Sequence, residues 1–326
     1  MYQADVNKTI KRGLSWPRVL FLLLIMLLVA ACEEALFDGL SGEHNTFSNQ
    51  GRGDSAGVLV VTESTQIPAT ASALRELFDA RGYQLQSVRD QSNPVPPIFA
   101  MRIPPDMAAE DSSLRKDLFL RLALPVLLEV NREIAADRAY LLSSGYQGPV
   151  RSASDPRIRA IAERYYASGS MDELLTRVDI LPPALMLAQA VVESGWGTSR
   201  FAIEGQALYG QWTWNAEDAG IVPSERDAGA NHRVRAFASL LDCARAYAVN
   251  VNRHSAYQPL RDLRADLSDA EKSSAGHALA AGLLAYSTQG QRYVTKLREV
   301  METNRLHDFG AAGLSNRTQL MVVLTP

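Results

Sequence analysis

The sequence is poor in residues that build disulfides or metal sites. Among its 326 residues there are two cysteines, Cys32 and Cys243, and five histidines. The histidines are scattered, and none joins a cysteine at the spacing of a zinc site, so no structural metal is expected. If the thiol of Cys32 carries a lipid, it cannot form an intramolecular disulfide with Cys243. Cys243 lies in a helix-like stretch and is expected to be a buried structural thiol.

The sequence also lacks a large net charge and several common catalytic motifs. The formal net charge is -3, so nothing in the charge balance calls for a nucleic acid partner. The sequence has no glycine-rich phosphate loop, no Ser-His-Asp spacing and no redox cysteine pair. No metal or organic cofactor is therefore implied. A composition of 47% hydrophobic and 21% charged residues is that of a folded globular protein.

The N-terminus has the features of a secretory signal. A basic leader precedes an apolar run over 19–31, which is shorter than the roughly 20 residues of a membrane-spanning helix. The run ends in Val29-Ala30-Ala31-Cys32, which resembles the bacterial lipobox. We predict a signal peptide over 1–31 and a lipid anchor at Cys32, which would hold the protein in the cell envelope facing the periplasm. The alternatives are an uncleaved signal anchor or an accidental cysteine.

The remaining chain divides by composition. Residues 32–56, rich in Gly, Ser, Asn and Asp, are expected to form a flexible tether. Residues 57–143 form an upstream region, with predicted strands at 57–62 and 98–103 around a helix at 71–81. The helical pattern over 111–143 is expected to break into two helices at Pro125, because proline lacks an amide donor.

The rest of the chain, 155–310 with a tail at 311–326, is mostly helical by pattern. The segment 195–236 has no long periodic stretch, and the apolar residues 320–324 are a candidate added strand. The sequence therefore predicts a mostly α, α+β fold with a small α/β upstream region. The predicted helices span 156–168, 171–178, 182–194, 239–252, 257–266, 271–284 and 290–304.

Glu193 is the most unusual charged residue of the sequence. It ends an almost wholly apolar helix that begins at Pro182 and stops at Gly195. Charged side chains are almost never fully buried unless paired. The negative end of the helix dipole and an apolar setting that includes Trp196 should both raise the pKa of Glu193. A carboxyl that stays protonated near neutral pH can act as a general acid. The alternative is a structural glutamate paired with a residue such as Arg200.

Several motifs give a family resemblance. The run Glu193–Ser199, followed by Leu208-Tyr209-Gly210-Gln211-Trp212, resembles the peptidoglycan-hydrolysing glucosaminidases of glycoside hydrolase family seventy-three, in particular the branch of the bacterial Bax protein. Weaker elements follow in the matching order, and the last runs from Tyr286 to Tyr293. The resemblance spans about 104–304. It implies a lysozyme-like helical catalytic domain whose substrate is the glycan strand of peptidoglycan, cut at β-1,4 linkages after N-acetylglucosamine.

The resemblance also assigns roles to individual residues. Glu193 matches the catalytic acid, and Tyr286 matches a tyrosine that would orient the acetamido group of the sugar or a water. Trp196 and Tyr293 lie within the matching motifs and are further candidates for substrate binding. Aromatic rings suit the apolar faces of sugars, although packing in the core is the alternative role for each. The candidates for stacking are Tyr209, Trp212 and Trp214.

The second carboxylate is left open by the sequence. Cleavage through an oxocarbenium-like transition state usually involves two carboxyl groups, unless the substrate's own acetamido group assists. Glu225 is the preferred candidate, and a solvated loop charge beside Arg226 is the alternative. The other candidates between Gly195 and Ala236 are Glu204, Glu217, Asp218 and Asp227.

Two other functions compete with glycan hydrolysis. A lytic transglycosylase would share the fold and the single glutamate. Such enzymes typically carry a Gly-Leu-Met-Gln element, whereas this chain has Leu208-Tyr209-Gly210-Gln211-Trp212, which favours a glucosaminidase. A non-catalytic, glycan-binding envelope lipoprotein is the other alternative. The partners implied are peptidoglycan and, through Cys32, the membrane; no protein partner is indicated.

Overall fold

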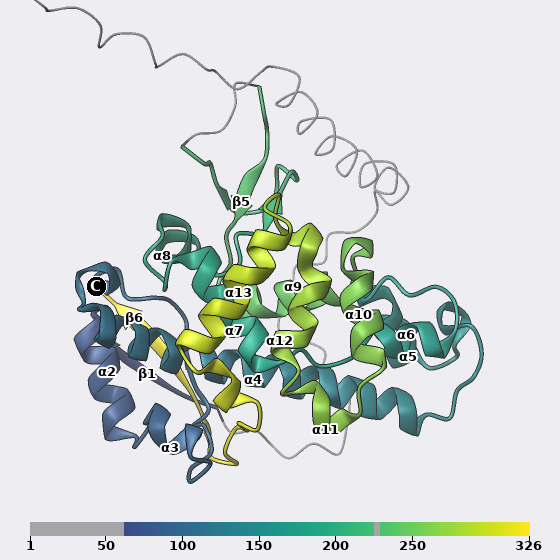
Figure 1. Ribbon diagram of the computed structural model, residues 1–326, viewed down its shortest axis with the longest axis horizontal. Helices are drawn as coiled ribbons and strands as arrows, with labels where there is room; N and C mark the ends of the chain where they lie inside the picture. The colour runs from purple at the N-terminus through teal and green to yellow at the C-terminus, as the bar shows by residue number, and fades with distance from the viewer. Residues whose placement is uncertain (1–61, 225–228) are drawn as a thin grey trace, which may run out of the picture. The chain divides into compact units, whose positions relative to one another are not determined.

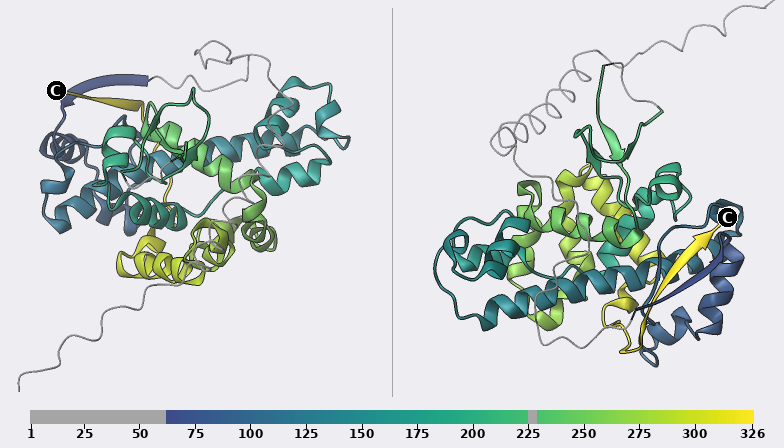
Figure 2. Two further views of the ribbon diagram at one scale, coloured as in Figure 1. Left: turned by 90° about the horizontal axis from the view of Figure 1, so that it is seen from above. Right: turned by 180° about the vertical axis from the view of Figure 1, so that it is seen from behind.

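A short parallel sheet joins two distant parts of the chain in the computed structural model, which describes residues 62–224 and 229–326. Strand β6 (Gln319–Thr325) lies between β1 (Thr62–Pro68) and β2 (Ile98–Ala100), and both neighbours are parallel to it. Figure 2 shows β6 beside β1 in its right-hand view. The apolar run near residue 320 is therefore a strand, and it is the central one.

The strands of the upstream region differ slightly from the prediction. A strand was expected at 57–62, but β1 runs over 62–68, and residues 57–61 lie outside the described part of the chain. Helix α2 (Ala71–Ala80) follows it, capped by the side chain of Thr70. Helix α3 (Leu85–Arg89) and the 3-10 turn η1 (Met107–Ala109) flank β2. The predicted strand–helix–strand unit is present, but its two strands do not pair with each other, because β6 separates them.

One long helix, α4 (Ser112–Ser143), continues through Pro125, so the predicted break into two helices is wrong. A proline inside a helix costs about 3 kcal/mol. Every residue from 118 to 131 is buried, and this packing outweighs the cost. Polar contacts also hold α4 on both sides of the proline. Arg121 donates to Asp79 of α2 at 2.5 Å, and Asn131 donates to the carbonyl of Leu181 at 2.7 Å.

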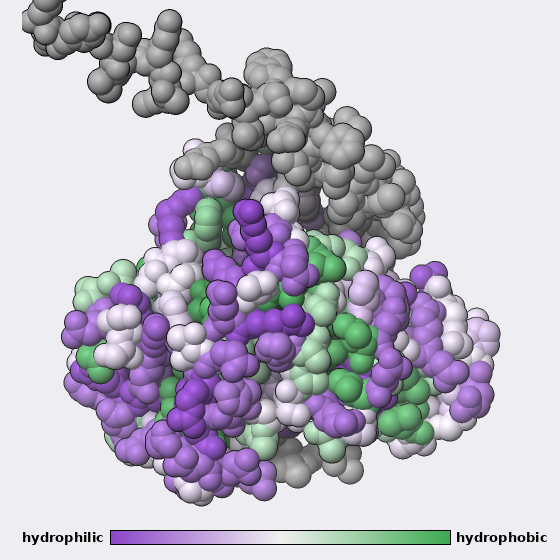
Figure 3. Space-filling view, viewed as in Figure 1, coloured by the Kyte–Doolittle hydropathy of each residue, from purple (hydrophilic) through white to green (hydrophobic). Residues whose placement is uncertain are grey.

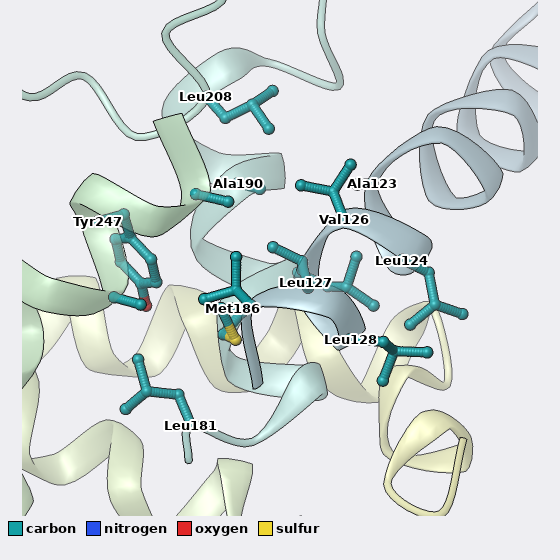
Figure 4. Close-up of a cluster of buried hydrophobic side chains, with 14 of the residues drawn as sticks. Ala123, Leu124, Val126, Leu127, Leu128, Leu181, Met186, Ala190, Leu208 and Tyr247 are labelled. Atoms are coloured by element: carbon teal, nitrogen blue, oxygen red, sulfur yellow. The ribbon is translucent and has the colours of Figure 1, made fainter. Parts of the chain in front are cut away.

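Helix α7 (Pro183–Ser194) lies at the centre of the helical part, as Figure 1 shows. It packs against α4, α12 (Gly276–Leu279), α13 (Gln291–Thr303) and η5 (Leu306–Phe309). The residues from Pro183 to Val191 are buried without exception, because the helix is apolar on all sides. Figure 4 shows Met186 and Ala190 of α7 between side chains of α4 and Tyr247 of α9 (Leu240–Arg253).

The other helices follow the predicted pattern with one exception. A single helix was expected over 271–284, but the chain forms α11 (Asp269–Lys272), α12 and the 3-10 segment η4 (Ala280–Tyr286). The break has a packing reason: Gly276 and Gly282 bring the chain close to Ala184 and to Leu260. The remaining elements are η2 (Val150–Ser152), α5 (Pro156–Arg164), α6 (Met171–Arg177), α8 (Arg200–Gly205), η3 (Ser255–Tyr257) and α10 (Gln258–Ala265).

The segment without periodicity contains a second small sheet. Strand β5 (Arg233–Arg235) lies between β3 (Trp212–Thr213) and β4 (Gly220–Ile221), and both pairings are antiparallel. Val234 is the buried residue of β5, while the rings of Trp212 and Trp214 are exposed. The mostly helical α+β fold expected from the sequence is confirmed.

Buried charges connect α6 and α7 to α10 and α11. Asp179, which is 5% exposed, receives Lys272 Nζ at 2.8 Å and lies 3.7 Å from Arg138 Nη1. The guanidinium of Arg264 donates to the carbonyl of Asp179 and to the side chain of Asn252, at 3.1 and 2.7 Å. Because each buried charge has a partner, the network holds the loop before α7 in place.

The surface does not show a large apolar area on the side seen in Figure 3. Hydrophilic residues dominate this face, and hydrophobic ones form small scattered patches. In the described ranges, no helix combines the length and hydrophobicity needed to cross a bilayer. The predicted signal peptide, Cys32 and the tether all lie before residue 62, outside the described residues.

Candidate active site

The position of Glu193 depends on how α7 ends. Gly195 terminates the helix in the left-handed conformation, with φ of 59°. Trp196 and Gly197 continue with φ of 61° and 76°, so the backbone turns sharply after Glu193. The hydroxyl of Ser194 accepts a hydrogen bond from the Gly197 amide at 2.9 Å and donates to the Ala190 carbonyl. This tight turn leaves the Glu193 carboxyl half-buried at the end of a buried helix.

Within the described part of the chain, the carboxyl of Glu193 has one hydrogen-bond partner. The hydroxyl of Tyr293 donates to its Oε1 atom at 2.8 Å. Burial raises the pKa of Glu193, while the bond from Tyr293 and the positive charge of Lys296 lower it by less. The direction agrees with the sequence prediction. The predicted alternative pairing with Arg200 does not occur, since Arg200 lies 3.6 Å from Glu204 instead.

Tyr293 leads from Glu193 to two further buried polar side chains. Its hydroxyl accepts a hydrogen bond from Gln189 Nε2 at 3.1 Å, and Gln189 Oε1 accepts one from the hydroxyl of Tyr247 at 2.5 Å. Sequence reasoning missed Gln189 and Tyr247. The position of Gln189, one helical turn before Glu193 on an otherwise apolar helix, was the available signal.

Tyr286 lies next to Tyr293 at the end of η4. The two rings stack with centroids 5.5 Å apart and an interplanar angle of 4°, and Tyr257 lies 5.7 Å from Tyr286 on its other side. The Tyr286 hydroxyl donates to the carbonyl of Tyr209 at 3.1 Å. Burial raises the pKa of Tyr286 well above its ordinary value, so its hydroxyl stays protonated. The structure thus brings Glu193, Tyr286 and Tyr293 together from segments about a hundred residues apart.

Comparison with known proteins shows the family of the chain. Residues 169–306 match the family described as Glucosaminidase, mannosyl-glycoprotein endo-beta-N-acetylglucosaminidase. The chain is 33% identical over 201 residues to Protein bax of Escherichia coli strain K12. The aligned region covers 59% of this chain and 70% of Protein bax. The chain belongs to the glucosaminidase family. A glycoside hydrolase role is therefore supported.

A solved structure is also similar to this chain. It is the catalytic domain of the autolysin Auto from Listeria monocytogenes, at 18% sequence identity and a TM-score of 0.32. The likeness covers 56% of this chain and 97% of the autolysin domain. The family match at 169–306 contains all the residues of the Glu193 site described above.

Two of the aromatic residues predicted to bind sugar have buried rings. Tyr209 is 2% exposed and stacks on Tyr247, with ring centroids 3.7 Å apart. Tyr293 is also 2% exposed, and its hydroxyl is bonded to Glu193. Neither ring has a free face on which a sugar could stack. The structure therefore favours the alternative of core packing for Tyr209 and a role beside the acid for Tyr293.

Two exposed aromatic side chains lie at the small antiparallel sheet. Trp212 and Trp214 are each 45% exposed, with ring centroids 6.0 Å apart. His232, just before β5, stacks on Trp212 with ring centroids 4.3 Å apart and an interplanar angle of 6°. Trp212 lies two residues after Gly210, and a Cβ atom added at Gly210 would be 3.8 Å from Glu193 Oε2. We call Trp212, Trp214 and His232 the aromatic platform.

Trp196 contacts a different part of the fold from the one expected. Its ring meets Phe119 of α4 edge to face at 5.9 Å, and Lys116 Nζ lies 5.1 Å from its centroid. The half-buried Trp196 therefore packs against α4, where it positions the turn after Glu193.

Three of the five candidates for a second carboxylate lie in the described part of the chain, and two lie outside it. Glu204 is exposed and faces Arg200, and Asp218 accepts a hydrogen bond from Thr213 at 2.6 Å and lies 3.8 Å from Arg235. Glu217 is exposed. The preferred candidate, Glu225, and Asp227 belong to 225–228, outside the described residues.

Two predictions concern cysteine and metals. Cys243 is buried, as predicted, and burial raises the pKa of its thiol to about 12. Its sulfur accepts a hydrogen bond from the Leu208 amide at 3.3 Å, so it supports the segment between α8 and β3. Within 62–224 and 229–326, no three His, Cys, Asp or Glu side chains are grouped to hold a metal ion.

Proposed function

We propose that this chain is an endo-β-N-acetylglucosaminidase that hydrolyses the glycan strands of peptidoglycan, with Glu193 as the general acid. One observation carries the proposal: in a chain of the glucosaminidase family, a carboxyl with a raised pKa ends the buried helix α7. Such a carboxyl can protonate the oxygen of the departing sugar. The bond cleaved is the β-1,4 linkage after N-acetylglucosamine.

The other residues have supporting roles in this proposal. Tyr286, held by the carbonyl of Tyr209, orients the acetamido group of the sugar or the attacking water. The aromatic platform binds the apolar face of a sugar ring. Its first exposed tryptophan, Trp212, follows Gly210 by two residues in the sequence, and Gly210 lies near Glu193. The second carboxylate is Glu225 unless the acetamido group of the substrate takes its place.

We also propose that the protein is anchored at the cell envelope. The signal at 1–31 and the lipobox-like residues before Cys32 support a lipid anchor facing the periplasm, where peptidoglycan lies. Labelling of the cells with a radioactive fatty acid tests this. Incorporation into the wild type and its loss in Cys32→Ala are expected, whereas labelling of both proteins or of neither contradicts the anchor.

The experiment that tests the activity is digestion of purified peptidoglycan by the full-length chain in mild detergent, with mass analysis of the fragments. We expect fragments with reducing N-acetylglucosamine ends. Glu193→Gln should lower the rate about 10²- to 10⁴-fold, the usual contribution of a general acid. Glu299→Gln is the control, because Glu299 is an exposed carboxylate of α13, the helix that also carries Tyr293.

Three other results would each change the proposal. Fragments with anhydro-muramyl ends would make the protein a lytic transglycosylase. Normal binding to glycan without any cleavage would make it a binding protein. Equal activity of wild type and Glu193→Gln would remove Glu193 as the acid.

A further inference from the structure

A chain of buried side chains reaches Glu193 from α9 through α7 and α13. Tyr247 donates to Gln189, Gln189 donates to Tyr293, and Tyr293 donates to Glu193 Oε1, at 2.5, 3.1 and 2.8 Å. Gln189, Tyr247 and Tyr293 are at most 2% exposed. We call these three residues the relay. Buried polar groups that are fully satisfied specify one arrangement, because the loss of any partner is costly.

The direction of these hydrogen bonds follows from elementary chemistry. An ionised carboxylate can only accept, so Tyr293 must donate its single proton to Glu193. The oxygen of Tyr293 can then only accept, and Gln189 must face it with its amide nitrogen. The carbonyl oxygen of Gln189 therefore faces Tyr247, which donates. Each member determines the orientation of the next.

This direction also determines which oxygen of Glu193 carries the acidic proton. In the neutral carboxyl Tyr293 still donates to Oε1 as long as Gln189 faces Tyr293 with its amide nitrogen. In that arrangement the proton of the neutral carboxyl is on Oε2. Among the described residues Oε2 has no hydrogen-bond partner, and a Cβ atom built on Gly210 would lie 3.8 Å from it. A proton on Oε2 is therefore on the side of the carboxyl that faces Gly210.

We propose that Gln189 and Tyr247 are positioning residues that act through Tyr293 to keep the proton of Glu193 on Oε2. This inference rests on the proposed function, in which that proton passes to the glycosidic oxygen. The bond from Tyr293 then stabilises the carboxylate that remains, since a hydrogen bond to a charged acceptor is stronger than one to a neutral acceptor.

Tyr247 is needed because the side-chain amide of Gln189 could otherwise rotate and exchange the positions of its oxygen and nitrogen. Without its hydroxyl, Gln189 has no donor at its carbonyl end, and the amide can rotate so that its oxygen faces Tyr293. Tyr293 would then divide its proton between Gln189 and Glu193. The stacking of Tyr247 on Tyr209 holds the Tyr247 hydroxyl in position in the native protein.

The relay makes a prediction about the sign of a titration shift. Four ionisable groups act on Glu193: Tyr293 and Lys296 of α13, Tyr247 of α9 and Tyr286 of η4. The bond from Tyr293 lowers the pKa of Glu193. Loss of the relay weakens that bond and should raise this pKa further. Looser packing that admits water would lower it instead, because burial is the main cause of the raised pKa.

The test uses full-length variants Tyr247→Phe, Gln189→Leu and Tyr293→Phe, with soluble glycan strands as substrate. Each should lower kcat about tenfold at unchanged KM, as expected for the loss of one hydrogen bond that matters in the transition state. The double variant of Tyr247→Phe with Tyr293→Phe should be no more than about two-fold worse than Tyr293→Phe alone, because Tyr247 acts only through Tyr293.

Tyr83→Phe is the matched control. Tyr83 is also a buried tyrosine, 1% exposed, but its hydroxyl has no hydrogen-bond partner and it lies between α2 and α3. We expect wild-type kcat and an unchanged titration of Glu193. Multiplicative losses in the double variant, or a reduced kcat in the control equal to that of Tyr247→Phe, would overturn the relay.

A second measurement does not depend on turnover. The titration of the Glu193 carboxyl carbon is followed by ¹³C NMR, and its signal is assigned by its loss in Glu193→Gln. An upward shift in Tyr247→Phe and Gln189→Leu supports the relay; no shift or a downward shift refutes it. If the wild type does not cleave glycan strands at all, the proposed function fails, and this titration still decides whether the relay exists.

Discussion

Gly282→Ala is expected to destabilise the protein strongly, because η4 and α10 touch at this residue. A Cβ atom built on Gly282 would lie 2.3 Å from the Cα atom and 2.4 Å from the amide nitrogen of Leu260. Carbon atoms pack at about 3.5–4.0 Å, so the two segments would have to separate by about 1 Å or more. The obstacle is backbone, which cannot rotate away as a flexible side chain would.

Helix α10 resists this movement through two buried arginines. Arg261 donates to the carbonyl groups of Val251 and His254, and Arg264 donates to the carbonyl of Asp179. Overpacking in a core costs typically about 1–3 kcal/mol, and a buried hydrogen bond broken by the shift adds about 1–3 kcal/mol. We expect a loss of about 3 kcal/mol in the free energy of unfolding, out of the roughly 5–15 kcal/mol usual for proteins.

The assay is equilibrium unfolding in urea, combined with activity on soluble glycan strands. The expected loss corresponds to a midpoint about 1 M lower. Activity should also fall, because Tyr286 ends η4 and moves with it. Gly313→Ala is the control, since nothing lies within 4 Å of a Cβ atom there. A Gly282→Ala protein as stable as Gly313→Ala would refute the reasoning that the contact is rigid.

Three further predictions concern buried ionisable groups. Because the pKa of Glu193 is raised in the folded state, wild type should lose stability relative to Glu193→Gln as the pH rises above the ordinary value of 4.5, as measured by urea unfolding at several pH values; a constant difference contradicts it. Asp179→Asn removes the buried one of the two carboxylates that pair with Lys272 and leaves only the exposed Asp269, so it should cost about 3–5 kcal/mol in unfolding free energy, whereas exposed Glu204→Gln should cost less than about 1 kcal/mol. Cys243 should resist alkylation at neutral pH and react only after unfolding, as peptide mapping by mass spectrometry will show; rapid labelling of the folded protein would mean that its thiol is accessible.

The sequence alone predicted the elements that depend on local pattern. Glu193 was located at the end of an apolar helix because a starting proline, an apolar run and a terminal glycine are neighbours in the chain. The mostly helical α+β fold follows from similar local signals. Tyr286 was proposed from motif resemblance, and the structure places it beside Tyr293, which contacts Glu193.

Local pattern failed where distant segments compete with it. Pro125 predicted a break, yet buried contacts on both sides carry α4 through it. The segment 271–284 looked like one helix, but Gly276 and Gly282 approach other segments too closely for a straight one. In both cases the free energy of packing exceeds the local preference, and that packing cannot be read from neighbours in the chain.

The sequence by itself determined which apolar helix ends in Glu193 and where most of the neighbouring helices form, because these depend on residues within a few turns of one another. Only the tertiary structure decided that β6 lies between β1 and β2, that the ring of Tyr209 is buried while Trp212 and Trp214 are exposed, and that Gln189 and Tyr247 reach Glu193 through Tyr293. Those arrangements join residues tens to hundreds of positions apart, and the free energy that selects them comes from burial and hydrogen bonding between segments rather than from conformational preference within one.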